Sequence, residues 1–363
     1  MTWAPPVAPP LATMRNLIPS LSSRALARTP APLALALCLP LLACGDGDTG
    51  DTDATGTAAD SDSGTTGDTG GEQSGDLVGT FRVELVSPQA ATADSPATPG
   101  KTTVLGKIYD GVYPAQIIWE EGTKVGDCQL LTPRVPFCNT PCGGSAVCVE
   151  DDTCQDYPLS GSAGTVTVKG LKTEDGKSEF TMEPIANNYQ APATAALSYP
   201  AFAEGDTISM TASGDKFGAF KLSGRGIAPL AVTTKSFALA VDQPLTLTWT
   251  PAAEPTRSTL HVKLDISHHG GSKGMISCDT ADSGSLEIGG ALITELLGLG
   301  VAGFPTIIVT RQAVGSATIA EGRIDLLLAS SLEYAVQIDG LTSCTDDVDC
   351  SDGQTCQSDL TCQ

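Results

Sequence analysis

The chain has 363 residues, and its 42 Asp and Glu against 20 Lys and Arg give a formal net charge of −22. A surface of this sign repels phosphate backbones and anionic lipid head groups, which argues against nucleic-acid binding and against electrostatic docking to a membrane. Only 3 histidines are present, which limits histidine-based catalysis and metal sites built from several histidines.

Residues 1–43 predict an export signal. The apolar run 31–43 is preceded by three arginines and by no acidic residue (Arg15, Arg24 and Arg28). A basic segment followed by ~10 to 13 apolar residues is typical of a secretory signal and is too short to span a membrane. Residues 1–13 make the segment before the basic part of the signal unusually long, so both Met1 and Met14 are candidate start sites of translation.

The signal ends in the sequence Leu41-Leu42-Ala43-Cys44-Gly45. This segment resembles the lipobox of bacterial lipoproteins, which implies that Cys44 is acylated and becomes the new N-terminus. Each buried CH₂ of an acyl chain contributes about 0.8 kcal/mol, so several chains on one cysteine hold a protein at a bilayer. Gly45 does not resemble the Asp retention signal of some inner-membrane lipoproteins, which favours the outer membrane. The alternative is an ordinary cleaved signal in which Cys44 is accidental.

Residues 44–76 predict a disordered, acidic linker. Between 45 and 76 the chain has nine acidic residues, no Lys or Arg, and many Gly and Thr. A segment of this composition has too little apolar surface to offset the conformational entropy lost on folding. We therefore expect an extended tether that lifts the folded part off the membrane. Calcium binding by Asp-x-Asp pairs (Asp46 with Asp48, Asp60 with Asp62) is the alternative, but calcium ligands need fixed turns and bidentate carboxylates.

After Leu77 the apolar residues alternate with polar ones, as in Thr80–Leu85 and Leu260–Ile266. A period of two predicts antiparallel strands with one buried face. Turn-forming clusters such as 251–255 separate these runs, and the only helix that we expect is short, at 290–297. The other predicted strands are 103–108, 116–119, 165–168, 179–182, 208–212, 219–222, 237–241, 245–249, 306–310, 324–328 and 334–338.

Many short strands with turn-rich connections predict β-sandwiches. The expected fold is mainly β, with two antiparallel sandwich-like units at 77–230 and 231–343 and a boundary near 226–234. The second unit resembles an immunoglobulin-like sandwich with Trp249 in its core. This resemblance concerns the fold and implies no function.

Ten cysteines follow Cys44, an even number, which predicts five disulfides in an exported chain. Two groups of them recur at intervals of six residues, and the residues around 147–155 and 355–363 match in kind. These modules, placed at 128–154 and 344–363, resemble the small Dickkopf-N-terminal-like or EB-like cysteine-rich modules. The ten candidates are Cys128, Cys138, Cys142, Cys148, Cys154, Cys278, Cys344, Cys350, Cys356 and Cys362.

The cysteine count in each unit is odd, which bears on the pairing. If each repeat closes on itself, Cys128 and Cys278 remain, and either they join the two units or both stay free. We favour the bond between them. Within a four-cysteine repeat three pairings are possible, and the spacing does not choose among them.

Metal sites are not predicted. Zinc clusters usually contain CxxC pairs, which these modules lack, and an export route oxidises thiols. The acidic stretch Asp347–Gly353 is similar to a calcium loop but lacks the distal bidentate Glu, so a solvated loop between disulfides is the better interpretation.

No catalytic residues are predicted either. His268 and His269 follow a strand, where adjacent side chains point to opposite faces and seldom reach one ion, so a polar hairpin loop is the favoured interpretation. No Gly-x-Ser-x-Gly motif is present. Three acidic residues lie near Cys278 in the sequence and could form a carboxylate pair (Asp279, Asp282 and Glu287). Solvated side chains at the edge of a sheet explain them equally well.

As a whole, the chain resembles lipid-anchored surface proteins of the kind abundant in myxobacteria, on the strength of the lipobox, the acidic tether, the strand-rich units and the cysteine-rich modules. The resemblance implies a location in the cell envelope, at the outer membrane. We expect a non-enzymatic binding, adhesion or structural protein without a cofactor, whose partner is an envelope protein or a polysaccharide. Such binding needs an exposed apolar or aromatic patch, for which Tyr109, Tyr113 and Trp119 are candidates, although packing within a sheet is the favoured interpretation for each of them. The alternative is a secreted hydrolase-like enzyme whose site forms only on folding.

Overall fold

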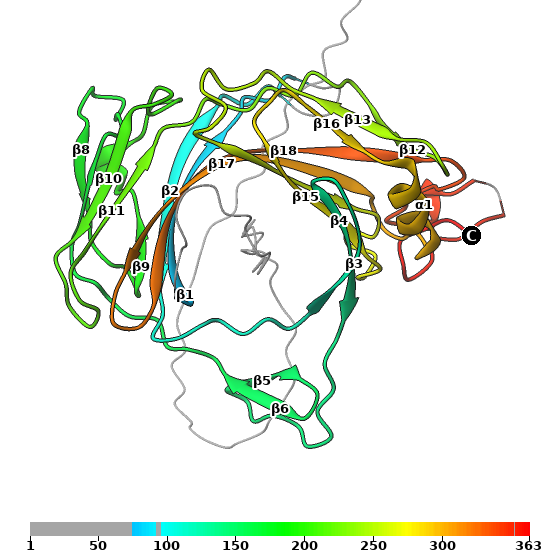
Figure 1. Cartoon of the computed structure of the whole chain (residues 1–363), viewed down its shortest axis with the longest axis horizontal. Coiled ribbons are helices and arrows are strands. Elements are labelled where there is room, and N and C mark those ends of the chain that lie inside the picture. The colour runs from blue at the N-terminus through cyan, green and yellow to red at the C-terminus, as the bar shows by residue number, and fades with distance from the viewer. Residues whose placement is uncertain (1–74, 92–95, 352) are drawn as a thin grey trace, which may run out of the picture. The chain divides into compact units, whose positions relative to one another are not determined.

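The computed structural model describes residues 75–91, 96–351 and 353–363. The predicted signal segment, the candidate lipidation site Cys44 and the linker up to residue 74 lie outside the described residues. Within them the chain is mainly β, with several sheets, a short helix and small disulfide-rich modules (Figure 1). The predicted fold class is therefore confirmed.

The largest sheet has ten strands, in the order β3-β4-β15-β14-β17-β18-β1-β2-β9, with β12 paired to β18 outside this path. It runs as one continuous, curved sheet in Figure 1. The strands are β1 (Leu77–Val86), β2 (Lys101–Ile108), β3 (Ile118–Val125), β4 (Cys128–Arg134), β9 (Asn188–Gln190), β12 (Phe237–Leu239), β14 (Thr259–Asp265), β15 (Met275–Ala281), β17 (Thr306–Thr318) and β18 (Arg323–Ile338).

Three smaller sheets complete the β structure of the described residues. A four-stranded sheet has the order β11-β10-β7-β8, and the pairs β13-β16 and β5-β6 form two-stranded sheets. Their strands are β5 (Ala146–Glu150), β6 (Thr153–Asp156), β7 (Val166–Lys169), β8 (Glu179–Met182), β10 (Thr207–Ala212), β11 (Phe220–Arg225), β13 (Leu245–Thr248) and β16 (Ser285–Ile288). Short 3₁₀ turns lie at Ala193–Ala195 and Asp347–Asp349.

Alternation in the sequence explains why these segments form strands. In β1, Phe81, Val83 and Leu85 are buried, whereas the residues between them are only partly so. β14 buries every second side chain in the same way, as period-two patterns require. The helix α1 (Gly290–Gly298) agrees with the predicted 290–297 and buries its apolar face (Leu292, Ile293 and Leu296).

The buried apolar residues form two separate cores. The first includes Phe81, Tyr189 and Phe220, and the second includes Trp249, the alternate apolar residues of β14 and the apolar face of α1. Along the chain, Ile227 belongs to the first core and Leu230 to the second.

Strands that contribute to the two cores share one sheet. β1 pairs in parallel with β18, with Phe81 opposite Leu326. The reason is the length of β17 (13 residues) and β18 (16 residues), whose antiparallel pair reaches both cores. In β18, Leu326 and Leu328 lie in the first core and Val336 lies in the second.

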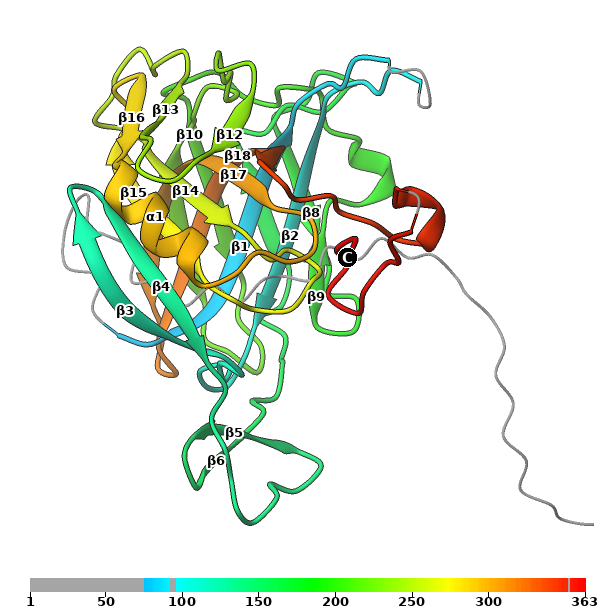
Figure 2. The same cartoon turned by 90° about the vertical axis from the view of Figure 1, so that its right-hand side faces the viewer.

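All ten described cysteines form disulfides. Cys128 and Cys278 are directly opposite on β4 and β15 and are bonded to each other. The hairpin β5-β6 is closed by two bonds, 138 to 148 and 142 to 154, and lies apart from the larger sheets in Figure 2. The C-terminal module is closed by two bonds, 344 to 356 and 350 to 362. The first module therefore begins at Cys138, because Cys128 belongs to the large sheet.

The C-terminal module is hydrogen-bonded to the loop that precedes β17. The Gly303 amide donates to the Asp359 carbonyl at 2.7 Å, and the Ser343 hydroxyl donates to the Gly303 carbonyl at 2.6 Å. Among the described residues, no helix is long and apolar enough to cross a membrane.

Candidate binding site

Three tyrosines form a continuous aromatic group, which we call the tyrosine cluster (Tyr109, Tyr113 and Tyr157). The ring centroids of Tyr109 and Tyr113 are 5.4 Å apart, and those of Tyr113 and Tyr157 are also 5.4 Å apart, with interplanar angles of 58° and 50°. These separations lie within the range of favourable aromatic pairs. Tyr113, in the middle, is 43% exposed, so the cluster presents ring surface to solvent.

The first part of the cluster is held at the end of β2. The Tyr109 amide donates to the Val78 carbonyl at 2.8 Å, which fixes the residue against β1. The Asp110 amide then donates to the Leu159 carbonyl at 3.1 Å, and the Leu159 amide donates to Asp110 Oδ1 at 2.7 Å. This reciprocal pair joins the segment after β2 to the segment after β6.

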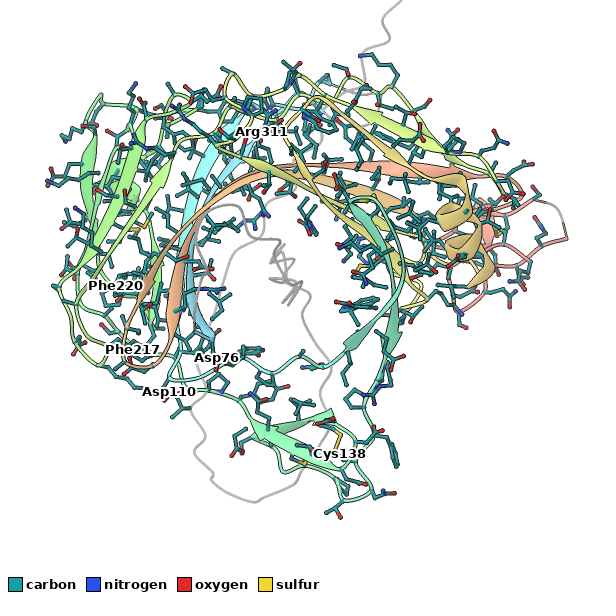
Figure 3. The ribbon with its side chains drawn as sticks, in the orientation of Figure 1. Asp76, Asp110, Cys138, Phe217, Phe220 and Arg311 are labelled. Carbon is teal, nitrogen blue, oxygen red and sulfur yellow. A yellow bond between two sulfur atoms is a disulfide. The ribbon has the colours of Figure 1, made fainter. Side chains whose placement is uncertain are left out.

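Asp110 also forms an ion pair with Lys216, whose Nζ lies 3.0 Å from Asp110 Oδ2. The hydrogen bond from Lys216, together with that from the Leu159 amide, lowers the pKa of the Asp110 carboxyl. Asp110 is labelled beside the end of the large sheet in Figure 3, and Cys138 marks the first module. A carboxylate thus stays ionised next to the tyrosine cluster at neutral pH.

The first disulfide module supplies the third ring. Tyr157 directly follows β6, and its amide donates to the Ser145 carbonyl at 2.8 Å. The Gln116 amide group donates to the Tyr157 hydroxyl at 2.8 Å, and the Gln155 side chain donates to the Val112 carbonyl at 3.0 Å. The disulfides that close β5-β6 therefore also position the cluster.

Polar groups surround the three rings. The Lys107 ammonium lies 5.3 Å from the centroid of the Tyr109 ring, within cation–π range. With the Gln116 amide and the Asp110 carboxylate, the cluster offers ring faces, phenolic hydroxyls and both signs of charge. Such a surface can stack on a ligand and hydrogen-bond to hydroxyl groups, because tyrosine combines an apolar ring with a polar end.

The structure brings together two of the three aromatic residues that the sequence singled out. Tyr109 and Tyr113 lie in the cluster, whereas Trp119 lies on β3, opposite Pro133 of β4. Tyr157 was missed, because its role depends on the fold of the disulfide module rather than on a local pattern. Its position three residues after Cys154, at the end of that module, is the only signal in the sequence.

A row of polar side chains crosses the large sheet on the face opposite the cores. Its members stand opposite one another on four adjacent strands: Asp279, His261, Thr310 and Ser331. His261 Nδ1 lies 3.0 Å from Asp279 Oδ1, and the Thr310 hydroxyl donates to the Ser331 hydroxyl at 3.1 Å. The carboxylate of Asp279 and the imidazole of His261 resemble the pair that activates a nucleophile in general-base catalysis. The neighbouring hydroxyl, that of Thr310, donates to Ser331 instead of to His261.

The three acidic residues near Cys278 are separated by the fold. Asp279 contacts His261, whereas Asp282 is fully buried and bonded to Arg311. Glu287 lies on β16, opposite Thr246. These carboxylates therefore do not form the pair that the sequence allowed.

In the C-terminal acidic stretch, the carboxylates cap backbone groups. Asp349 Oδ2 accepts hydrogen bonds from the Thr345 amide at 2.8 Å and from its hydroxyl at 2.9 Å. These bonds lower the pKa of Asp349. Asp347 Oδ1 accepts from the Cys356 amide at 2.8 Å. The aspartates thus bind the module to itself.

Two groups of three cysteine sulfurs lie close enough together to suggest a metal site. All six belong to disulfides in the two modules. Metal ligation by cysteine requires a thiolate, so these sulfurs act as crosslinks in this structure.

No protein-family model matches the chain, and no curated protein matches its sequence. Among solved structures, the chain is similar to the FN1–FN3 domains of chicken CNTN1 with 9% identity and a TM-score of 0.16. The alignment covers 65% of this chain and 74% of the chicken chain. A likeness of this size carries no argument about fold or function.

Proposed function

We propose that this protein is a lipid-anchored protein of the cell envelope, at the outer membrane, that binds a ligand through the tyrosine cluster without catalysing a reaction. The observation that carries the proposal is the aromatic cluster with its exposed central ring, Tyr113, which is held by backbone hydrogen bonds and a disulfide module. The five disulfides support export, because disulfides persist mainly in oxidising compartments. Anchoring through Cys44 rests on the lipobox alone.

Of the two expected partner classes, a polysaccharide fits the cluster better than a protein. A specific protein interface buries about 800 Å² on each partner, whereas three partly buried tyrosines offer a small fraction of that area. A sugar ring, in contrast, has an apolar C–H face that matches one aromatic ring and hydroxyls that match an amide or a carboxylate. Tyr113 supplies the ring, Gln116 supplies an amide bonded to the Tyr157 hydroxyl, and Asp110, next to Tyr109 in the chain, supplies the carboxylate.

The proposal is tested with polysaccharide purified from the envelope of the producing cells. Tyr113→Ala removes the central ring and is expected to weaken binding about tenfold, which corresponds to ~1.4 kcal/mol. Tyr113→Phe keeps the ring and should bind nearly as well as the wild type. Phe137→Ala is the matched control, because Phe137 is 69% exposed in the same region but lies outside the cluster.

Isothermal titration of the four proteins measures the affinities. Equal polysaccharide affinity of the wild type and Tyr113→Ala would contradict a polysaccharide site. A second contradicting result would be that the wild type binds an envelope protein but no polysaccharide, and that Tyr113→Ala abolishes the protein binding. Anchoring is tested separately with Cys44→Ser. This change should move the protein from the membrane fraction to the soluble fraction, and mass spectrometry should show that it carries no acyl chains.

The alternative function, hydrolysis, has one observation in its favour, the pair of His261 and Asp279. It predicts that the wild type releases reducing ends from the same polysaccharide and that Asp279→Asn does not. The binding proposal predicts no release from either protein.

A further inference from the structure

The tyrosine cluster continues along the face of β2 that turns away from the first core. Leu105, Lys107 and Tyr109 occupy alternate positions of the chain, so they stand on one side of the strand. Ile108, between two of them, is fully buried in the first core. The Lys107 ammonium lies 5.3 Å from the centroid of the Tyr109 ring, which confirms that the two side chains are neighbours. The three residues form a line about 13 Å long.

The last strand of the sheet widens this face. β9 follows β2 at this end of the large sheet (Figure 1), with Gln190 opposite Leu105 and Asn188 opposite Lys107. Tyr189, between the two amide residues, is buried in the first core, so both amides share the exposed face of β2. Directly opposite side chains of an antiparallel pair are about 5 Å apart. We call these four residues the β2–β9 platform (Leu105, Lys107, Asn188 and Gln190).

Hydrogen bonds fix the platform relative to the tyrosine cluster. Asn188 Nδ2 donates to the Ala186 carbonyl at 3.0 Å, which orients this side chain and leaves its oxygen to accept a hydrogen bond. Asn187 Nδ2 donates to the Ser160 carbonyl at 3.1 Å, and Ser160 is paired with Tyr109 in a β-bridge. Because both surfaces are held before a ligand arrives, little entropy is lost in aligning them.

The platform combines an exposed apolar side chain with a cation. Leu105 is 57% exposed, and no carboxylate of the described residues forms an ion pair with Lys107. Asp110, the acidic residue next to Tyr109, is already paired with Lys216. At physiological ionic strength, exposed charges more than about 8 Å away are largely screened. The local charge at Lys107 is therefore positive, although the chain as a whole has a net charge of −22.

We propose, as an extension that rests on the proposed function, that the β2–β9 platform binds an acidic sugar unit of the same polysaccharide, one that carries a carboxylate. The Lys107 ammonium pairs with the carboxylate, as a point charge with three donors can. Leu105 packs against a C–H face of the sugar, and the amides of Asn188 and Gln190 hydrogen-bond to hydroxyl groups. The tyrosine cluster holds the neighbouring units of the same chain.

The test compares two forms of the polysaccharide purified from the envelope of the producing cells: the native form, and the same material after chemical reduction of its carboxyl groups to alcohols. In calorimetric titrations, the wild-type full chain should bind the native form about fivefold more tightly than the reduced form, as expected for one partly exposed ion pair. Lys107→Met should bind both forms with the lower affinity. About 0.5 M NaCl should remove the preference of the wild type, because salt screens the pair.

Two further variants control for charge and for the apolar contact. Lys221→Met removes another exposed lysine, on β11 in the four-stranded sheet, and should bind both forms as the wild type does. Leu105→Ala should weaken binding of both forms while the preference for the native form remains. All the substituted side chains are at least partly exposed on strands, so the melting temperatures should stay close to that of the wild type.

Tyr113→Ala separates this proposal from the proposed function. It should weaken binding of both forms, whereas Lys107→Met should affect the native form alone. If Tyr113→Ala weakens binding but neither carboxyl reduction nor Lys107→Met does, the platform proposal is overturned and the tyrosine cluster remains a binding site. If Tyr113→Ala has no effect, the proposed function fails as well.

Discussion

At the scale of single residues, the ion pair of Arg311 and Asp282 is almost completely buried. The Arg311 side chain is 1% exposed and that of Asp282 is 0% exposed, and Figure 3 labels Arg311 on the large sheet. The guanidinium donates to both carboxylate oxygens, at 2.7 and 2.9 Å, and the Trp249 indole and Ser258 hydroxyl donate to the same carboxylate. The guanidinium also donates to the Pro229 carbonyl at 3.2 Å, at the boundary between the two cores.

This network sets the ionisation of Asp282. Burial alone would raise the pKa of the carboxyl, but the hydrogen bonds from Arg311, Ser258 and Trp249 together hold the pKa below its usual value. A carboxyl whose pKa is lower in the folded state contributes stability above its unfolded pKa of about 3.9, and this contribution is lost as the pH falls through the folded value. The pair therefore contributes at neutral pH and weakens in acid.

Asp282→Asn leaves the Arg311 charge buried without its partner. We expect the free energy of unfolding at pH 7 to fall by about 3 to 5 kcal/mol, as for other broken buried pairs. The difference between the two proteins should begin to shrink below about pH 4, where the carboxyl of the unfolded wild type takes up a proton, and should go on shrinking until the pH reaches the lower pKa of the folded state. Urea unfolding at a series of pH values measures both effects, and a difference that stays constant into acid would contradict the assignment.

At the scale of elements, β17 and β11 approach each other so closely that a side chain has no room between them. A Cβ atom at Gly315 of β17 would overlap the Ser223 carbonyl of β11 and meet Gly224 Cα at 3.4 Å. This contact joins the four-stranded sheet to the long hairpin of β17 and β18, where the first core forms. Glycine at Gly315 is thus required by packing rather than by a turn.

Gly315→Ala is expected to destabilise the protein by about 1 to 3 kcal/mol, because the added methyl group must push the two strands apart. Gly143→Ala is the control, since no atom lies within 4 Å of a Cβ placed there. Thermal unfolding compares the two variants. Equal melting temperatures would show that the strands separate at no cost.

At the scale of the whole molecule, the bond between Cys128 and Cys278 connects residues 150 apart in the sequence. Both cysteines are buried, at 1% and 0% exposure, and they join the β3-β4 hairpin to the strands of the second core. The loop that this bond closes contains most of the first core. A crosslink over so long a loop constrains the unfolded chain far more than the 10- and 12-residue spans within the modules do.

Replacing both Cys128 and Cys278 by Ala is expected to lower the free energy of unfolding by about 4 to 5 kcal/mol, on the loop-entropy estimate. The modules should stay folded in this variant, because their own bonds remain. Chemical unfolding measures the loss, and hydrogen exchange of residues 138–156 checks the module. A loss below about 1 kcal/mol would show that the unfolded chain is already compact without the bond.

The strands were predictable from the sequence because their pattern is local. Alternation alone placed β1 and β14 close to their observed bounds, and the odd number of cysteines in each unit pointed to the bond between Cys128 and Cys278. Strand pairing was not predictable, because β1 and β18 are distant in sequence and their contact depends on the whole fold. The same holds for the site, since Tyr157 meets Tyr113 only through the fold of a disulfide module.

The position of β1 has a mechanical consequence. A pull on the residues before Leu77 enters the body at the start of β1, which is bonded to β18 on one side and to β2 on the other. The tyrosine cluster lies at this same end of β1, because the Tyr109 amide donates to the Val78 carbonyl. Tension between the N-terminal end and a ligand on the cluster would therefore pass through one corner of the body, and most of the length of β1 would carry none of it.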